Sequence, residues 1–376
     1  MSDYTRYVGL DVHQERIAVC VVGAEGEEQP TSIIANDPDV IAKVMRRIAR
    51  QAGGPEALHC CYEAGPCGYT LYRQLRRMGI SCNVVAPSLT PVRPGSRVRT
   101  DRRDAHKLGR LERAGELTAV WVPDEAHEAL RDLVRAREDA KEDHLRAKHR
   151  LSKFLLRHGK RPPEPLKAWT QKHGRWLDTV HFEQGMQETV LAEYRQQVRE
   201  TREAILRLEA QIELAVQQSP LRDSIMALQT LRGVGLIVAA TLASEIGDIT
   251  RFTHPRQMMS YAGLTPSEDS SGSMVRRGGI TKMGNRHVRR ALVEAAWSYR
   301  HTPRVAGELE RRQQGQSPQI KSISWKAQVR LNGRYRWLIS RGKPRNQAVI
   351  AVARELVGFV WEVACAVQKQ SLAQAA

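Results

Sequence analysis

Several features that mark other classes of protein are missing from this sequence of 376 residues. It holds no run of roughly 18 apolar residues, and its first segment, MSDYTRYVGLDVHQ, lacks the apolar stretch of a signal peptide, so we predict neither a membrane span nor secretion. The six cysteines form no Cys-x-x-Cys pair, which argues against a zinc ribbon or a disulfide framework. We therefore expect a cytoplasmic protein with buried free thiols.

Acidic residues are also scarce, because Asp and Glu number 41 against 59 Lys and Arg, which gives a formal charge of +18. Such an excess favours a polyanionic partner, with nucleic acid first and an anionic membrane surface second. No zinc finger, basic zipper or clear helix-turn-helix pattern accompanies it. Direct reading of a base sequence is therefore not predicted.

One acid-free segment, 311–354, carries eleven basic residues, with Trp325, Tyr335 and Trp337 among them. Two interpretations stay open for these aromatic rings. They stack on unpaired bases of RNA or of a displaced strand, or they form the core of a helical subdomain. Either way, the segment predicts a basic surface.

Residues 1–124 are predicted to form an α/β domain of the RNase H type. Alternating apolar and polar residues in YVGLDVHQERIAVCVVG predict two strands of a hairpin. Similar patterns predict three more strands and three helices in the rest of this domain. Their order is strand, strand, strand, helix, strand, helix, strand, helix.

Residues 125–219 are predicted to form a helical hairpin, and residues 220–376 a mainly α-helical domain. Apolar residues in the hairpin fall near heptad spacing on both sides of HGKRPPEPLKAW, which must break the helix. A coiled coil within one chain and one between two chains stay open. The last domain starts with LQTLRGVGLIVAATLASEIGD, which resembles a helix-hairpin-helix whose turn can face a phosphate.

Four carboxylates come from separate predicted elements: Asp11 on the first strand, Glu63 at the end of a later strand, and Asp101 and Asp104 on one face of a helix. Mg²⁺ prefers oxygen ligands, and activating a nucleophile at a phosphate requires several carboxylates that converge. The ordered set therefore predicts a magnesium site. The alternative for VRTDRRDAHKLGRL is a solvated helix with ion pairs between neighbouring turns.

A second acid-free segment, between Asp269 and Glu294, combines glycines with Arg and Lys. Glycine-rich backbone beside basic side chains is suited to holding phosphates. The serines of this segment, taken alone, predict only a polar turn. The residues predicted to bind nucleic acid, here and beside the carboxylates, are Arg99, Arg102, Arg103, Arg276, Arg277, Lys282, Arg286, Arg289 and Arg290.

The motifs GLDVHQ, YEAGPCGY, RTDRRDA and YAGLTPSEDSSG, followed by GGITKMGNRHVRRAL, together resemble the IS110 family of insertion-sequence transposases, which are recombinases guided by a bridge RNA. The resemblance extends from about residue 7 to about residue 300. It implies a RuvC-like domain with an Asp-Glu-Asp-Asp set that holds Mg²⁺, made here of Asp11, Glu63, Asp101 and Asp104. It also implies a C-terminal transposase domain with a nucleophilic serine directly before a glycine. That position is Ser271, with Ser270 and Ser273 as open alternatives.

The resemblance implies a transposase and site-specific DNA recombinase that cleaves and rejoins strands through a covalent serine–phosphate intermediate. Its partners would be DNA at the element ends and at the target, a structured bridge RNA, and further copies of the chain. A dimer or tetramer is expected because recombination exchanges strands of two duplexes. Two alternatives stay open: a RuvC-type junction endonuclease that acts by hydrolysis, and a non-enzymatic nucleic-acid-binding protein.

The charge excess predicts that binding to duplex DNA weakens steeply with added salt. Each phosphate that the chain neutralises contributes about 0.9 to the slope of log affinity against log salt concentration. Fluorescence anisotropy of a labelled duplex, titrated at several NaCl concentrations, measures this slope. An affinity that stays constant from low to physiological salt would contradict an interface dominated by phosphate contacts.

Overall fold

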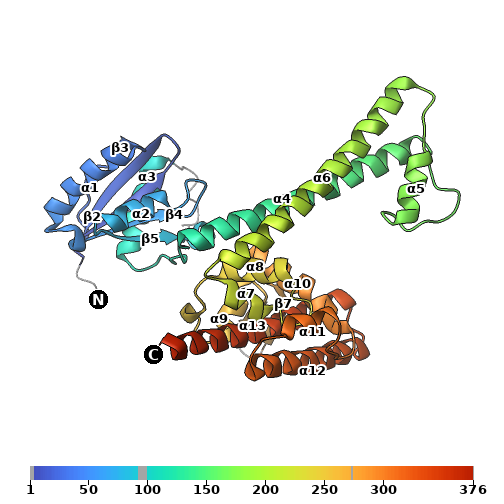
Figure 1. The fold of residues 1–376 in the computed structure, drawn as a ribbon. Helices are drawn as coiled ribbons and strands as arrows, with labels where there is room; N and C mark the ends of the chain where they lie inside the picture. The colour runs from blue at the N-terminus through green and yellow to red at the C-terminus, as the bar shows by residue number, and fades with distance from the viewer. Residues whose placement is uncertain (1–3, 92–99, 272–273, 376) are drawn as a thin grey trace. The chain divides into compact units, whose positions relative to one another are not determined.

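The computed structural model describes residues 4–91, 100–271 and 274–375 (Figure 1). The chain divides into two compact units, Met1–Val122 and Pro123–Ala376, and each is described by itself. The predicted first boundary, at 124, lies two residues from this division. Within the described residues, no helix combines the length and apolar character needed to cross a bilayer.

The first unit is built on a five-stranded sheet with the order β3-β2-β1-β4-β5. β1 pairs antiparallel with β2 and parallel with β4; β2 also pairs with β3 antiparallel, and β4 with β5 parallel. The strands are β1 (Arg6–Val12), β2 (Arg16–Gly23), β3 (Ser32–Ala35), β4 (Leu58–Glu63) and β5 (Ser81–Val85). The mixed α/β character and the order of elements predicted from the sequence are confirmed.

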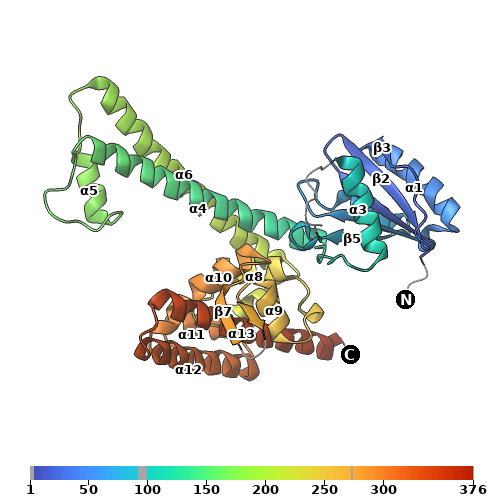
Figure 2. The ribbon, with the colours of Figure 1, turned by 180° about the vertical axis from the view of Figure 1, so that it is seen from behind.

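Helices cover both faces of this sheet. α1 (Pro38–Ala52) and α2 (Thr70–Arg77) bury Met45 and Leu75 against one face. α3 (Asp101–Arg113) lies on the opposite face, where Ala105 packs against β2 (Figure 2). Asp37 and Thr100 cap the first turns of α1 and α3, which fixes where each helix begins.

Two glycines allow α3 to approach β1 backbone to backbone. A Cβ on Gly9 would lie 2.0 Å from the carbonyl oxygen of Ala105 and 2.3 Å from the amide nitrogen of Gly109. Since side chains alternate along a strand, Gly9 and Asp11 face the same side of the sheet, toward α3. This contact therefore holds the first turn of α3 close to Asp11.

The second unit begins with two long antiparallel helices, α4 (Glu125–Arg157) and α6 (Gly185–Gln218), with α5 (Gln171–Thr179) between them. The helices lie side by side, and Nδ1 of His144 is 3.0 Å from the hydroxyl oxygen of Thr201. The helix break predicted between them is confirmed. Coiled-coil packing stays a prediction.

The rest of the second unit is mainly helical, as predicted. Its elements are α7 (Arg222–Leu228), α8 (Leu236–Ile246), α9 (Pro255–Tyr261), β6 (Pro266–Ser271), β7 (Met274–Ile280), α10 (Arg286–Ala296), α11 (Glu308–Gln313), α12 (Pro318–Ser340) and α13 (Arg345–Ala375). Short 3₁₀ turns are η1 (Pro55–Ala57), η2 (Pro87–Leu89), η3 (Ile249–Arg251) and η4 (Trp297–Arg300). Leu130 of α4 and Val216 of α6 share one core with α8, α10 and α13. The boundary predicted at 219–220 thus falls inside this unit and stays a prediction.

Two sequence-based expectations for this unit need correction. The serines were expected in a polar turn, but Ser271 is the last residue of β6, which pairs antiparallel with β7. Trp325 and Trp337 do not belong to the core, because they are 46% and 49% exposed on α12. Tyr335, in contrast, packs against the core.

The close approach of α3 to β1 predicts that Gly9→Ala destabilises the chain by about 1–3 kcal/mol, the usual cost of overpacking, because the added methyl group meets backbone atoms. A matched control is Gly333→Ala, on an exposed part of α12 where a Cβ meets nothing within 4 Å. That change should instead raise stability by about 0.5–1 kcal/mol. Urea unfolding of both variants measures the difference, and a neutral Gly9→Ala would contradict the contact.

Candidate active site

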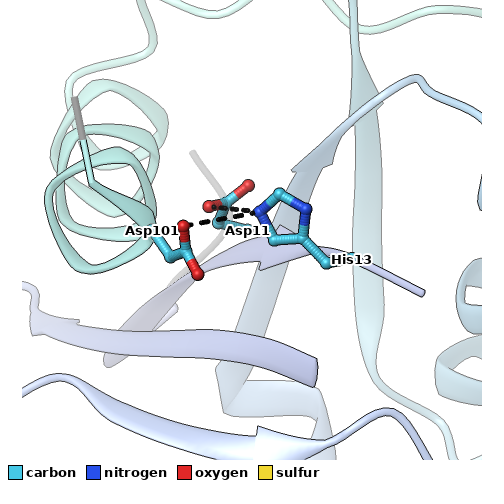
Figure 3. Close-up of side chains that lie close together, drawn as sticks. All are labelled: Asp11, His13 and Asp101. Carbon is cyan, nitrogen blue, oxygen red and sulfur yellow. Dashed lines mark hydrogen bonds and ion pairs between the residues drawn. The ribbon is translucent and has the colours of Figure 1, made fainter. Parts of the chain in front are cut away.

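Three side chains converge at the end of β1. Nε2 of His13 lies 3.2 Å from Oδ2 of Asp11 and 3.7 Å from Oδ1 of Asp101 (Figure 3). One potential ligand atom from each of the three residues lies within 4.8 Å of the others. Asp11 comes from β1 and Asp101 from the first turn of α3, so this cluster depends on the glycine contact described above. Its geometry allows all three residues to bind one metal ion.

The cluster carries negative charge that is only partly balanced. Burial raises the pKa of Asp11, the charges of Asp101 and Asp104 raise it further, and His13 acts in the opposite direction. Nη2 of Arg16 lies 2.9 Å from Oδ2 of Asp101 and offsets part of that charge. A divalent cation with a preference for oxygen ligands fits such a donor set, because it would relieve the repulsion around Asp11.

The other two predicted carboxylates, Asp104 and Glu63, are not part of this three-residue cluster. Asp104 is half-buried one turn along α3, close enough for its charge to act on Asp11. Glu63 is the exposed last residue of β4, and the parallel pairing of β1 with β4 ends one residue earlier, at Leu10 opposite Tyr62.

His13 and Arg16 were not predicted as site residues, although the sequence places both near Asp11. His13 follows Asp11 by two residues in GLDVHQ, the spacing of side chains on the same face of a strand. Arg16 opens the partner strand of the same hairpin. Arg102 and Arg103, predicted to bind nucleic acid, are exposed on α3. Arg99 lies outside the described residues.

The predicted serines belong to the second unit. Ser271 is exposed at the end of β6, opposite Met274 of β7. The neighbouring Ser270 hydroxyl donates to Oε1 of Glu268 at 3.0 Å. Ser273 lies outside the described residues. On β7, Arg276 is exposed and pairs across the hairpin with Asp269, while the backbone of Arg277 pairs with that of Glu268.

The β6–β7 hairpin, called the serine hairpin below, is anchored at its base to the core by a buried carboxylate. Asn285 caps α10, and its Nδ2 donates to Oε2 of Glu245 at 2.7 Å. Glu245 is 1% exposed and also accepts hydrogen bonds of 2.6 and 3.0 Å from Arg135 of α4. The Tyr261 hydroxyl donates to the Glu245 carbonyl at 2.8 Å. Glu245 of α8 thus connects α4, α9 and the start of α10.

The remaining predicted basic residues surround this base. Lys282 has a left-handed backbone with φ of 57°, and both Lys282 and Arg286 are exposed. Nη1 of Arg289 donates to the carbonyl of Ala262 at 3.1 Å. Arg290 is engaged within the protein, since its Nη1 lies 2.6 Å from Oε1 of Glu138.

The raised pKa of Asp11 predicts a stability change. Deprotonation of Asp11 costs free energy in the folded chain, so this residue lowers stability as pH rises above its ordinary pKa near 3.8. Asp11→Asn removes that cost. At pH 7 the metal-free variant should melt higher than the unmodified chain, and the difference should vanish at acidic pH.

Melting curves with and without Mg²⁺ complete this test. The cation should raise the melting temperature of the unmodified chain and of Glu25→Gln, an exposed control outside the cluster, but not of Asp11→Asn. An equal response of all three proteins would rule out Asp11 as a ligand.

Two family models match the parts of the chain that carry the carboxylates and the serine. A family model for an IS110 transposase of the Asp-Glu-Asp-Asp type, described as "Transposase", matches residues 8–159, which include all four carboxylates. A second model, described as "Transposase IS116/IS110/IS902 family", matches residues 226–309, which include the serine hairpin.

Individual relatives extend over nearly the whole chain. A candidate transposase of Sinorhizobium fredii, y4qE, is 44% identical over 375 residues, which are 97% of this chain and 90% of the relative. The transposase for insertion sequence element IS1533 of Leptospira borgpetersenii is 30% identical over 90% of this chain and 97% of the relative. The pilin gene-inverting protein of Moraxella bovis is 22% identical over 95% of each chain. The chain therefore belongs to the IS110 family of transposases, and it is a DNA-cleaving enzyme.

Proposed function

We propose that this transposase is a site-specific recombinase that cuts and rejoins DNA through a covalent bond between Ser271 and phosphate. The observation that carries the proposal is that two chemically different groups occur in one chain. The first unit holds an acidic cluster, and the second holds an exposed serine on a hairpin beside basic residues. A nuclease that acts by hydrolysis requires only the first group.

The acidic residues would hold Mg²⁺ through Asp11, Glu63, Asp101 and Asp104 in a RuvC-like domain. The strand order of the sheet and the match to the Asp-Glu-Asp-Asp family support this assignment. Bound there, Mg²⁺ would polarise a phosphoryl oxygen and offset the charge that develops on it. Arg16 keeps Asp101 oriented toward the cluster, and His13 is a further candidate ligand.

In the proposed step, Oγ of Ser271 forms a bond to phosphorus while the bond from phosphorus to a deoxyribose oxygen breaks. The serine proton passes to a base, and the departing oxygen takes up a proton. The hydroxyl of a second strand then reverses the step and releases the serine, so the number of phosphodiester bonds is conserved. Ser271 is favoured over Ser270 because it stands directly before Gly272, the position that the family resemblance implies for the nucleophile.

The relatives bear on the alternatives. One relative is named for inverting a pilin gene, and inversion requires that cut strands are rejoined. This favours recombination over a junction endonuclease that stops at hydrolysis. The non-enzymatic alternative is excluded, since the chain is a member of a transposase family.

Further proposals concern partners. The chain would bind DNA at the element ends and at the target, together with a structured bridge RNA that selects the target. Exposed Arg102, Arg103, Arg276, Lys282 and Arg286 are available for phosphate contacts. The long helices α4 and α6 would join protomers in a dimer or tetramer, because strands of two duplexes must be exchanged.

The decisive test is to trap the covalent adduct. Incubation with a labelled DNA substrate, Mg²⁺ and any copurifying RNA, followed by denaturation, should leave DNA attached to the unmodified chain. Ser271→Ala should abolish the adduct and recombination, yet keep DNA binding and stability within about 0.5 kcal/mol, because only an exposed hydroxyl is lost. Ser270→Ala is the matched control and should react.

Peptide mapping then locates the modified residue. An adduct on Ser270 or Ser273 would correct the position of the nucleophile. If Ser271→Ala recombines DNA at the normal rate and no serine carries DNA, the serine mechanism is wrong. Asp104→Asn should lose both adduct and cleavage, so cleavage that persists in this variant would contradict the metal site.

A further inference from the structure

A cleft of about 470 Å³ opens beside the base of the serine hairpin. Its lining combines four basic side chains, Lys282, Arg286, Arg289 and Arg290, with apolar side chains that include Val293, Trp297 and Ile350. The proposed catalytic step uses none of these residues. The cleft lies wholly within the second unit and involves only described residues.

The sequence of α10 and η4 produces this arrangement directly. Arg286, Arg290, Val293 and Trp297 follow each other by four, three and four residues, the spacing of one helix face. The face begins with cations at the start of α10 and ends with an aromatic ring. Ile350 of α13 completes the apolar part of the lining.

The charge of the cleft is positive after internal ion pairs are counted. Arg290 is paired with Glu138, and Nζ of Lys141 lies 3.4 Å from Oε1 of Glu294, so both of these lining residues are partly neutralised. Lys282 and Arg286 remain exposed. Burial lowers the pKa of Arg289, yet its guanidinium stays protonated at neutral pH.

We infer that the cleft binds one unpaired nucleotide of a DNA strand, with its base against Trp297, Val293 and Ile350 and its phosphate on Lys282, Arg286 and Arg289. An apolar surface next to cations matches the two parts of a nucleotide. The volume lies in the range of about 300–1,000 Å³ typical of small-molecule sites. A base inside a duplex is stacked on both faces, so only an unpaired base can insert.

The position of the cleft selects DNA as the source of this nucleotide. Ile280, the last residue of β7, lines the cleft and pairs with Pro266 at the base of the hairpin. Ser271 lies five residues further along β6, which is about 17 Å at the usual rise of a strand. A DNA strand attacked at Ser271 therefore passes within a few nucleotides of the cleft. This choice of strand rests on the proposed function.

The test compares binding of the full chain to fluorescent dT₁₅ and to the same oligonucleotide with abasic sites in its centre. The unmodified chain should prefer the version with bases. Trp297→Leu should weaken dT₁₅ binding by roughly 5- to 150-fold, the range that corresponds to loss of one stacked base. It should also remove the preference for bases and leave binding to a blunt duplex unchanged. Trp176→Leu, on α5 outside the cleft and partly packed as Trp297 is, should behave like the unmodified chain.

A second pair of variants tests the basic part. Arg286→Ala should weaken dT₁₅ and abasic DNA equally, because it removes a phosphate contact, whereas Arg47→Ala on α1 should have no such effect. This pair remains informative if Trp297→Leu fails to fold, which circular dichroism reports. An unchanged preference for bases in folded Trp297→Leu, or an unchanged affinity in Arg286→Ala, would overturn the inference.

Two further arms identify the strand. With rU₁₅ in place of dT₁₅, a larger loss on Trp297→Leu would assign the cleft to RNA and overturn the choice of DNA. Ser271→Ala should retain the full preference for bases, since binding does not require attack. A missing adduct with an intact, Trp297-dependent preference would therefore reject the serine mechanism while supporting the nucleotide site.

Discussion

The contact between Gly9 and Gly109 determines whether the first unit can hold its acidic cluster. A helix that packs on a sheet through ordinary side chains is held away from the strands by those side chains. Here the backbone of α3 touches that of β1, because neither glycine places a side chain between them. Asp101 and Asp104 therefore come close enough to Asp11 for their charges to raise its pKa. The cluster is stabilised by packing and destabilised by its own repulsion.

In the second unit, the buried carboxylate of Glu245 is stabilised by its partners, whereas Asp11 is destabilised by neighbouring charges. Burial alone would raise the pKa of this carboxyl group, but hydrogen bonds from Arg135 and Asn285 and the charge of Arg131 lower it overall. A buried charge with complete partners acts as an anchor, since removal of one partner typically costs about 3–5 kcal/mol. It connects the long helix α4 to the base of the serine hairpin.

The sequence predicted those features that depend on local periodicity. Alternation in the first strands and helical spacing elsewhere led to the correct order of elements in the first unit. Asp11 and Asp101 were predicted to converge, and the structure brings them together. Of the two interpretations left open for Trp325 and Trp337, the one that placed them in a core is wrong, because composition does not reveal which side chains meet solvent. Arg135 and Glu245 are 110 residues apart, and only the tertiary fold pairs them. Which serine reacts, and with what, stays a prediction.

The exposure of the hairpin that carries Ser271 bears on the conditions under which this serine could react. Two strands alone are marginally stable in water, and on β6 the residues from Glu268 to Ser271 are exposed, so the fold supports this ribbon mainly at its base. Under the proposed function, bound DNA would therefore supply much of the energy that positions the Ser271 hydroxyl. Without DNA the hydroxyl would not be held where it can attack a phosphate. Such an arrangement would limit unwanted phosphoryl transfer without a separate inhibitory segment.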